Sequence, residues 1–477
     1  MLFNSWQYAI FLPIVFIIYW VLPHRFRWAV LIAFSLYFYM CCGAKYLAVL
    51  ALIITVSFFS ALLIEKVQET RQNKLILTGS LIVCLGVLFA FKYLDFFFEI
   101  VDSLLSPMGL SLNNNTLNIV LPVGISFYTF QAIGYVIDVY RGKICAERHF
   151  GIYALFVSFF PQIMSGPIGR ADKLLPQFRE EKTFCNDKAI YGLEMIAWGF
   201  FKKIVVADNL AIFADRVFDR VGEYSGFALF LASVFYTIQI YCDFSGYTDI
   251  AAGSAKLLGI DLADNFRSPY FSASIKEFWS RWHISLSTWF RDYLYIPLGG
   301  NRRGTARKYF NLLVTFLVSG LWHGADWTFI AWGGLHGLAQ IAEYVFRLKE
   351  PKNSFSRVWR TICVFLFVNF AWIFFRCATF GDAAYMFANM FKGISSPISY
   401  VFDGLAAVNI RKITMVFIVV AYLIPLFVFD LISRKTDVYE AVADIKKPTR
   451  FIIYVVAVLY IIMFSASSSA SFVYFQF

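Results

Sequence analysis

Apolar runs long enough to cross a lipid bilayer recur along the whole chain. The hydrocarbon core of a bilayer is about 30 Å thick, so a helix rising 1.5 Å per residue needs roughly 20 apolar residues to cross it. Of the 477 residues, 60% are hydrophobic and only 15% are charged, whereas soluble domains carry roughly 25% charged residues. A water-soluble fold could not bury so many hydrophobic residues with so few charged ones on its surface. The sequence therefore predicts an all-α, polytopic integral membrane protein.

The candidate spans number about eleven to thirteen. They lie approximately at 7–22, 28–43, 46–64, 75–94, 119–140, 150–165, 190–213, 227–247, 309–346 (two pieces), 358–376, 412–432 and 451–467. With no internal repeat and no soluble domain of useful size between them, residues 1–477 are expected to form one membrane domain.

Two stretches depart from this pattern. Residues 150–165 run into Pro161 and the sequence SGPIGR, so they are too short and too broken for an ordinary crossing. A half-helix or re-entrant segment is expected there, with its open backbone covered by protein or water. Residues 266–308 are rich in Arg and Trp and contain no run long enough to span. They are expected to be amphipathic helices lying at, or dipping into, the cytoplasmic interface.

The basic residues predict the orientation. They follow the first, third and fifth spans (His24, Arg25, Arg27; Lys66, Arg71, Lys74; Arg141, Lys143, Arg148), whereas residues 95–118 carry acidic side chains and no Lys or Arg. Positive loops face the cytoplasm, which places the N-terminus outside. The net charge of +11 is spread over such clusters rather than one stripe, which argues against a nucleic-acid partner. The first apolar run has no basic residues before it and is expected to be a retained span.

Several site classes lack their signatures. The eight cysteines form no CxxC pair, so neither a disulfide framework nor a zinc site is indicated. The motifs GxSxG, GxxxxGK(S/T), HExxH and HxxxxD do not occur, which leaves serine hydrolases, ATPases, zincins and soluble glycerolipid acyltransferases without support. We expect no bound metal and no bound cofactor.

His323 is the strongest catalytic candidate. A helix started near Tyr309 rises about 21 Å by His323, past the bilayer midplane, and an ionisable group at that depth is by default a functional hypothesis. Gly320 and Gly324, which flank Trp322 and His323, would let the helix bend or break and a substrate approach the backbone closely. The alternative is a histidine hydrogen-bonded between packed helices.

Asp326 follows His323 by three residues. It is close enough in sequence to orient the imidazole, but it could equally cap a helix that starts at Trp327. His336, in GGLHG, is interpreted as a packing residue or a residue that supports the site from behind.

His283 lies in KEFWSRWHISLSTWFRDYLYIPLGG, close to Arg281 and Arg291. A histidine among these cations is suited to a gate for an anionic donor, although an interfacial aromatic belt with an incidental histidine explains the pattern too. If both histidines are functional, we expect His283 near the cytoplasmic face and His323 deep in the membrane, as two separate stations on one path.

Asp243 and Asp249 are further polar groups inside an apolar run. They are six residues apart, so they need not share a face of a straight helix. They could position His323, coordinate a cation, or pair with Arg or Lys from another helix.

A histidine without a paired nucleophile is most simply a general base. It would take the proton of an acceptor hydroxyl as that oxygen attacks an acyl thioester, which contributes about 10²–10⁴-fold in rate. Nearby backbone amides or Trp N–H groups would have to stabilise the oxyanion. A transporter with a His and Asp proton path is the rival from another class, but it predicts inverted repeats, which the sequence does not show. A scaffold for polysaccharide enzymes is the third option.

Seven segments carry a family resemblance. They are MLFNSWQYAIFLPIVFIIYW, LPVGISFYTFQAIGYVIDVYRG, FFPQIMSGPIGR, YCDFSGYTDIA, FWSRWHISLSTWFRDYLYIPLGG, SGLWHGADWTFIAWGGLHG and the final FVYFQF. Together they resemble the membrane-bound O-acyltransferase superfamily, in particular the bacterial branch that O-acetylates alginate and peptidoglycan. The similarity to the D-alanyl transfer proteins of teichoic acid modification is weaker.

The resemblance implies a helical bundle around a central funnel, with His323 matching the active-site histidine in WHG and His283 the second histidine in WHIS. It implies a cytoplasmic thioester donor, most simply acetyl-CoA, and an extracytoplasmic polysaccharide acceptor. The acyl group would reach the acceptor directly or through an SGNH-type transferase or esterase partner. A multi-pass protein of the bacterial inner membrane is therefore expected. Donation of D-alanine by a carrier protein is the alternative within the class.

Overall fold

The computed structural model describes residues 1–67, 69–108, 120–466 and 472, and every regular element among them is a helix. The predicted all-α class is confirmed. The chain packs into two compact units, the first comprising Met1–Leu193, Ala251–Ala263 and Gly324–Asp326, and the second Glu194–Ile250, Asp264–His323 and Trp327–Phe477. The sequence FVYFQF lies, except for Phe472, outside the described residues. The expectation of one domain over 1–477 stays a prediction.

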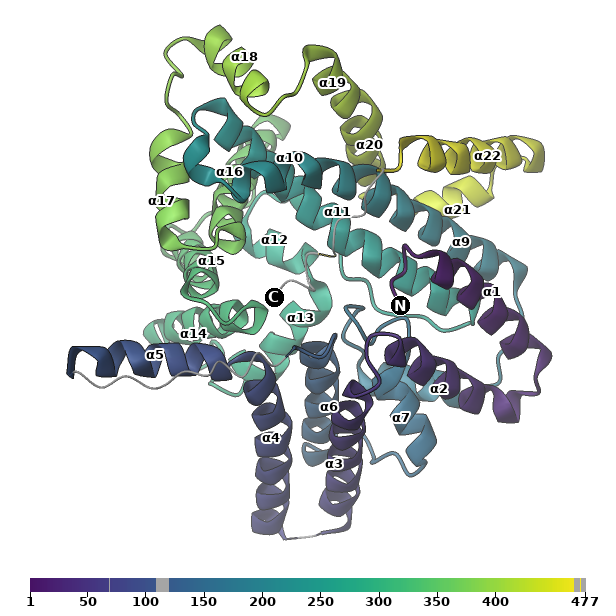
Figure 1. Cartoon of the computed structure of the whole chain (residues 1–477). Helices are drawn as coiled ribbons and strands as arrows, with labels where there is room; N and C mark the ends of the chain where they lie inside the picture. The colour runs from purple at the N-terminus through teal and green to yellow at the C-terminus, as the bar shows by residue number, and fades with distance from the viewer. Residues whose placement is uncertain (68, 109–119, 467–471, 473–477) are drawn as a thin grey trace. The chain divides into compact units, whose positions relative to one another are not determined.

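In the first unit, three helices pack against one another, namely α3, α4 and α6 (Figure 1). Helix α6 is buried along nearly its whole length. Helix α7 has nine residues and is about 14 Å long, too short to cross a bilayer, so the short helix expected at 150–165 is confirmed. The helices of this unit are α1 Trp6–Val21, α2 His24–Met40, α3 Tyr46–Lys66, α4 Thr70–Lys92, α5 Leu94–Leu105, α6 Ile125–Tyr140, α7 Phe150–Ser158 and α8 Ala171–Arg179.

Two helices, α9 Asn186–Phe200 and α11 Phe227–Leu257, contribute residues to both units. A π-helical segment, Phe201–Ala207, follows α9. The remaining helices belong to the second unit: α10 Asp208–Phe218, α12 Ile275–Arg281, α13 Ile284–Phe290, α14 Thr305–His323, α15 Trp327–Val345, α16 Ser354–Arg376, α17 Phe380–Asn389, α18 Pro397–Ala407, α19 Lys412–Phe417, α20 Ile424–Ser433, α21 Val438–Ala443 and α22 Lys447–Phe464.

Six helical stretches among the described residues are long and apolar enough to cross a membrane. They are Tyr46–Lys66, Thr70–Lys92, Phe227–Leu257, Ser354–Arg376, Lys412–Ser433 and Lys447–Phe464. The stretch expected at 309–346 folds as two pieces, α14 and α15, joined by residues 324–326. Residues 266–308 contain only short helices, α12, α13 and a π-helical segment Arg291–Tyr295, and no span. The chain is a multi-pass membrane protein.

The closest helix pair in the second unit is α14 with α15 (Figure 1). A Cβ atom at Gly320 would collide with the carbonyl oxygen of Phe329, and one at Gly333 with that of Phe316. The two glycines therefore let the backbones touch, as small residues do at tight helix crossings in membranes. The sequence suggested that Gly320 permits a bend, but α14 continues unbroken to His323, and the glycine serves close packing instead.

Two adjacent glycines of α15 provide a test of this crossing. Gly333→Ala is expected to destabilise the protein by about 1–3 kcal/mol, because overpacking against backbone cannot be relieved by a rotamer change. Gly334→Ala is the matched control, since its Cβ would meet only the Cδ2 atom of Leu317, at 3.4 Å. Thermal unfolding of both variants in detergent measures the difference. Equal melting temperatures would refute the role of the crossing.

Candidate active site

His323 is the last residue of α14 and lies in a buried aromatic cluster. Its ring centroid lies 4.9 Å from that of Trp322, 5.1 Å from Trp332 and 5.4 Å from Phe375. The rings around His323 are aromatic, and its side chain is buried. The close crossing one turn before His323 fixes the helix that carries it.

His283 occupies the junction of α12 and α13. It has a φ of 43°, a left-handed conformation that is uncommon for residues other than glycine, and its side chain is fully buried. Its Nδ1 lies 3.4 Å from the Oδ1 of Asn265, and its ring contacts Phe244 at 4.7 Å between centroids. A strained backbone that is retained at a buried histidine is typical of functional sites.

The two histidines lie side by side. Their ring centroids are 6.4 Å apart, and Trp322 contacts both rings. The sequence-based expectation of two separate stations was wrong, because α12 and α13 carry His283 inward to the end of α14. The residue is buried among packed helices instead of lying exposed at the interface.

Burial also determines the charge of His283. Desolvation lowers its pKa from 6.5 to about 3, so the imidazole is neutral at physiological pH. A neutral ring cannot attract an anionic donor by charge. A role of His283 in a gate for the donor stays a prediction, and attraction of an anionic donor by charge would have to come from lysine or arginine side chains.

His336 supports the site from the next helix. Its Nδ1 accepts a hydrogen bond of 3.2 Å from the indole N–H of Trp279. The ring is fully buried and contacts Trp332 at 5.1 Å. His336 thus holds Trp279 in place, in agreement with a role behind the reacting groups.

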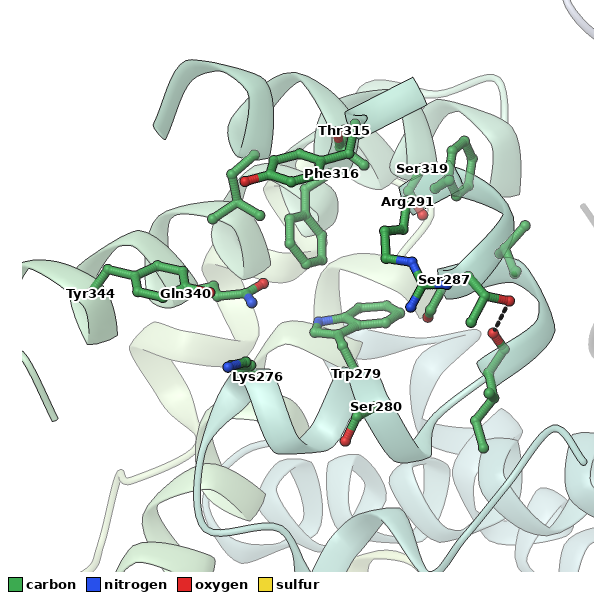
Figure 2. Close-up of a pocket in the computed structure, with 16 residues that line it drawn as sticks. Lys276, Trp279, Ser280, Ser287, Arg291, Thr315, Phe316, Ser319, Gln340 and Tyr344 are labelled. Carbon is green, nitrogen blue, oxygen red and sulfur yellow. Dashed lines mark hydrogen bonds between the residues drawn. The ribbon is translucent and has the colours of Figure 1, made fainter. Parts of the chain in front are cut away.

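A cavity of about 390 Å³ is lined by residues of α12, α13, α14 and α15, the helices that carry or adjoin the three histidines (Figure 2). Trp279 and Phe316 form apolar walls, and Ser319 lies one helical turn before His323 on the same face of α14. The lining is completed by Lys276, Ser280, Ile284, Leu286, Ser287, Thr288, Phe290, Arg291, Tyr295, Leu312, Thr315, Gln340 and Tyr344. A groove of this size, mostly apolar with scattered hydroxyls, suits a slender amphipathic ligand.

Cations surround the cavity. Lys276 and Arg291 line it, and the ammonium of Lys308 lies 3.3 Å from the centroid of the lining Tyr344. The pKa of Lys308 is lowered by burial and then by repulsion from Lys276. Within the described residues neither lysine forms an ion pair with a carboxylate, whereas Arg291 pairs with Asp292 at 2.8 Å. Positive charge is therefore available to an anionic ligand.

Arg281, the other expected gate residue, does not line the cavity. Its guanidinium pairs with Glu277 at 2.8 Å, and Glu277 also pairs with Arg357 at 3.2 Å. Asp326 lies in the turn between α14 and α15, in the first unit. Its role in orienting His323 stays a prediction.

Asp243 and Asp249 are both engaged by lysines of the π-helical segment. Lys203 bridges Asp243 at 2.6 Å and Asp208 at 2.8 Å, and Lys202 pairs with Asp249 at 2.7 Å. Of the three interpretations, pairing with a basic residue of another helix agrees with the structure. Removing one member of such a buried pair leaves an uncompensated charge. Loss of either aspartate is therefore expected to destabilise the fold.

Sequence reasoning missed Lys276, Trp279, Gln340 and Trp332. Two of them precede His283 on α12 and two lie on α15 with His336. The pattern of a single sequence does not reveal which of these helices contact one another. Only Ser319 could have been placed near the site from the sequence, because it lies four residues before His323 and residues four apart share a helix face.

A protein-family model, MBOAT, membrane-bound O-acyltransferase family, matches residues 147–381. The matched region contains His283, His323 and His336 and every residue of the cavity. Over 484 aligned residues the chain is 37% identical to "Probable alginate O-acetylase AlgI" of Pseudomonas putida, with 98% of both chains covered. The chain belongs to the membrane-bound O-acyltransferase family. It is an acyltransferase.

Other relatives of this family match less of the chain. "Peptidoglycan O-acetyltransferase" of Helicobacter pylori is 38% identical over 421 residues, covering 80% of this chain and 78% of that protein. "Teichoic acid D-alanyltransferase" of Streptococcus thermophilus is 30% identical over 285 residues, covering 56% of this chain and 66% of that protein. The O-acetylating relatives are thus more similar to this chain than the D-alanyltransferase is, in agreement with the resemblance seen in the sequence.

The neutral state of His283 makes the stability of this acyltransferase depend on pH. Its pKa of about 3 in the folded chain lies below the value of roughly 6.5 in an unfolded chain, so the unfolded state binds the proton first as pH falls. The stabilisation is complete above about pH 6.5 and is lost as pH falls toward 3, with about 2 kcal/mol lost by pH 5.

His283→Asn removes this titration, and Asn adopts a positive φ readily. Between pH 7.5 and 5 the variant is expected to lose about 2 kcal/mol less unfolding free energy than the unmodified protein, as measured by unfolding in detergent. Between pH 7.5 and 8.5 the two should show the same dependence. Parallel curves over the acid range would contradict the assignment.

Proposed function

We propose that the chain transfers an acetyl group from a cytoplasmic thioester, acetyl-CoA, to an extracytoplasmic polysaccharide, with His323 as the general base. The observation that carries the proposal is the buried His323 and His283 pair beside a cavity whose lining includes Ile284, the residue after His283, and Ser319, one turn before His323. Lys276 lines the same cavity and forms no ion pair among the described residues. The names of two relatives, an alginate O-acetylase and a peptidoglycan O-acetyltransferase, support acetyl as the acyl group and a glycan as the acceptor.

The proposed reaction balances without a cofactor. An acceptor hydroxyl oxygen attacks the thioester carbonyl carbon while a ring nitrogen of His323 takes the hydroxyl proton. The carbonyl π pair moves onto oxygen, and on collapse of the tetrahedral intermediate the C–S bond breaks. The departing sulfur takes the proton from the imidazolium, which restores neutral His323. The aromatic rings around His323 would shield this proton transfer from solvent.

The donor would occupy the cavity with its phosphates at the mouth. Acetyl-CoA carries a charged nucleotide at one end and a slim, largely uncharged pantetheine arm at the other. Lys276 and Lys308 would contact the phosphates, while Ser319, Gln340 and the aromatic walls would accommodate the arm. The thioester would then leave the cavity between Trp279 and Ser319, one helical turn from His323.

The acceptor lies on the opposite face of the membrane in this proposal. Basic loops after the first, third and fifth predicted spans favour an extracytoplasmic N-terminus and a location in the bacterial inner membrane. Transfer to alginate, peptidoglycan or a related glycan would be direct or relayed by an SGNH-type partner protein. Donation of D-alanine is less well supported, because the D-alanyltransferase relative covers little more than half of the chain.

His323→Gln is expected to lower acetyl transfer by at least about 10²-fold, because glutamine fills the space but cannot take up a proton. Proteoliposomes loaded with radiolabelled acetyl-CoA and supplied outside with soluble glycan would measure the transfer. Exposed His24→Gln serves as a control for loss of a histidine elsewhere. Normal transfer by His323→Gln would exclude the catalytic assignment and favour a scaffold.

The two lysines at the cavity mouth provide a separate test of the donor. Lys276→Ala with Lys308→Ala is expected to raise KM for acetyl-CoA about tenfold while kcat changes little, because charge pairing at the mouth contributes to binding rather than to the reacting centre. Acetyl-pantetheine, which lacks the phosphates, should show the same KM with both proteins. A raised KM for both donors would indicate a general structural defect instead of phosphate recognition.

A further inference from the structure

Three buried indoles form a row that ends at His323. Trp282, Trp332 and Trp372 are at most 1% exposed. The centroids of Trp282 and Trp372 are 5.1 Å apart, those of Trp372 and Trp332 are 5.3 Å apart, and Trp332 lies 5.1 Å from His323. The row connects α12, α16 and α15 to the end of α14.

The indole N–H groups of this row lack acceptors within the described part of the chain. Elsewhere, tryptophans bond: Trp20 donates to the carbonyl oxygen of Leu257 at 3.0 Å, and Trp279 donates to His336. Buried tryptophans normally find a partner for their N–H, and a buried donor without one requires an explanation. A cluster of such donors beside a general base points to an acceptor that arrives with the substrate.

We propose that the indole N–H of Trp332 binds the carbonyl oxygen of the acyl thioester and stabilises the oxyanion that forms on it, so that Trp332 is a catalytic residue. Trp332 is the member of the row whose ring contacts His323. Its centroid also lies 5.7 Å from that of Trp279, which lines the cavity. A thioester that leaves the cavity past Trp279 would therefore meet Trp332 and His323 together.

The position of Trp332 is also fixed in advance of the reaction. The next residue, Gly333, packs directly on the carbonyl oxygen of Phe316, and the ring of Trp332 is held between Trp372 and Phe375. An oxyanion donor is effective when it is already oriented and shielded from water, because no reorganisation is then needed in the transition state. The inference rests on the proposed acyl transfer and adds the group that stabilises its intermediate.

The test replaces the indole nitrogen without changing its shape. Trp332 is exchanged for β-(3-benzothienyl)alanine, which keeps the bicyclic ring and has sulfur where the N–H was. We expect kcat to fall about 10²-fold, with KM for acetyl-CoA and the melting temperature unchanged. The same exchange at Trp372 is the control, because that ring does not contact His323 in the described structure, and it is expected to leave kcat within about threefold.

Infrared spectra of bound acetyl-CoA labelled with ¹³C at the carbonyl provide a readout independent of turnover. Loss of the N–H should move the carbonyl stretch to higher frequency in the Trp332 variant but not in the Trp372 variant. Unchanged kcat and an unchanged carbonyl frequency at Trp332, with an active unmodified protein, would overturn this inference alone. An unmodified protein that neither binds nor uses acetyl-CoA would overturn the proposed function together with it.

Discussion

The backbone contact between α14 and α15 determines where His323 and Trp332, the proposed catalytic residues, lie. Gly320 and Gly333 let the two helices approach until carbonyl oxygens touch Cα atoms, and no side chain can be inserted there. His323 lies three residues beyond the contact on one helix, and Trp332 lies immediately before it on the other. In a bilayer, where lipid competes with protein for every apolar surface, such close packing supplies the van der Waals energy that holds helices together.

Charge is segregated along the path from the cavity to His323. Lysines lie at the cavity, whereas both histidines are surrounded by aromatic rings and the structure holds His283 neutral. The strongly charged pairs of Lys202 and Lys203 with aspartates are placed on α11 and the π-helical segment, where they join helices.

Sequence alone predicted the fold class and the two helical pieces at 309–346, and it named His323 as the principal candidate, because these follow from hydropathy and from the cost of an ionisable group in lipid. Neither piece is among the six stretches found long and apolar enough to cross a membrane. It did not predict that His283 and His323 are neighbours. Forty residues and a new helix separate them in the chain, and local patterns carry no information about a segment that turns inward. The role of Gly320 was misjudged for the same reason, since a glycine that permits a bend and one that permits close packing look identical in sequence.

The pairing of Asp243 and Asp249 illustrates the opposite case, in which a plain structural interpretation agreed with the structure. Two aspartates in an apolar helix need counter-charges wherever they lie, because an unpaired carboxylate in a low-dielectric interior is too costly to retain. Two adjacent lysines in a helix would ordinarily point about 100° apart. The π-helical segment widens the turn at Lys202 and Lys203, and both ammonium groups reach α11. The π-helical segment is thus where the charges of both aspartates are balanced.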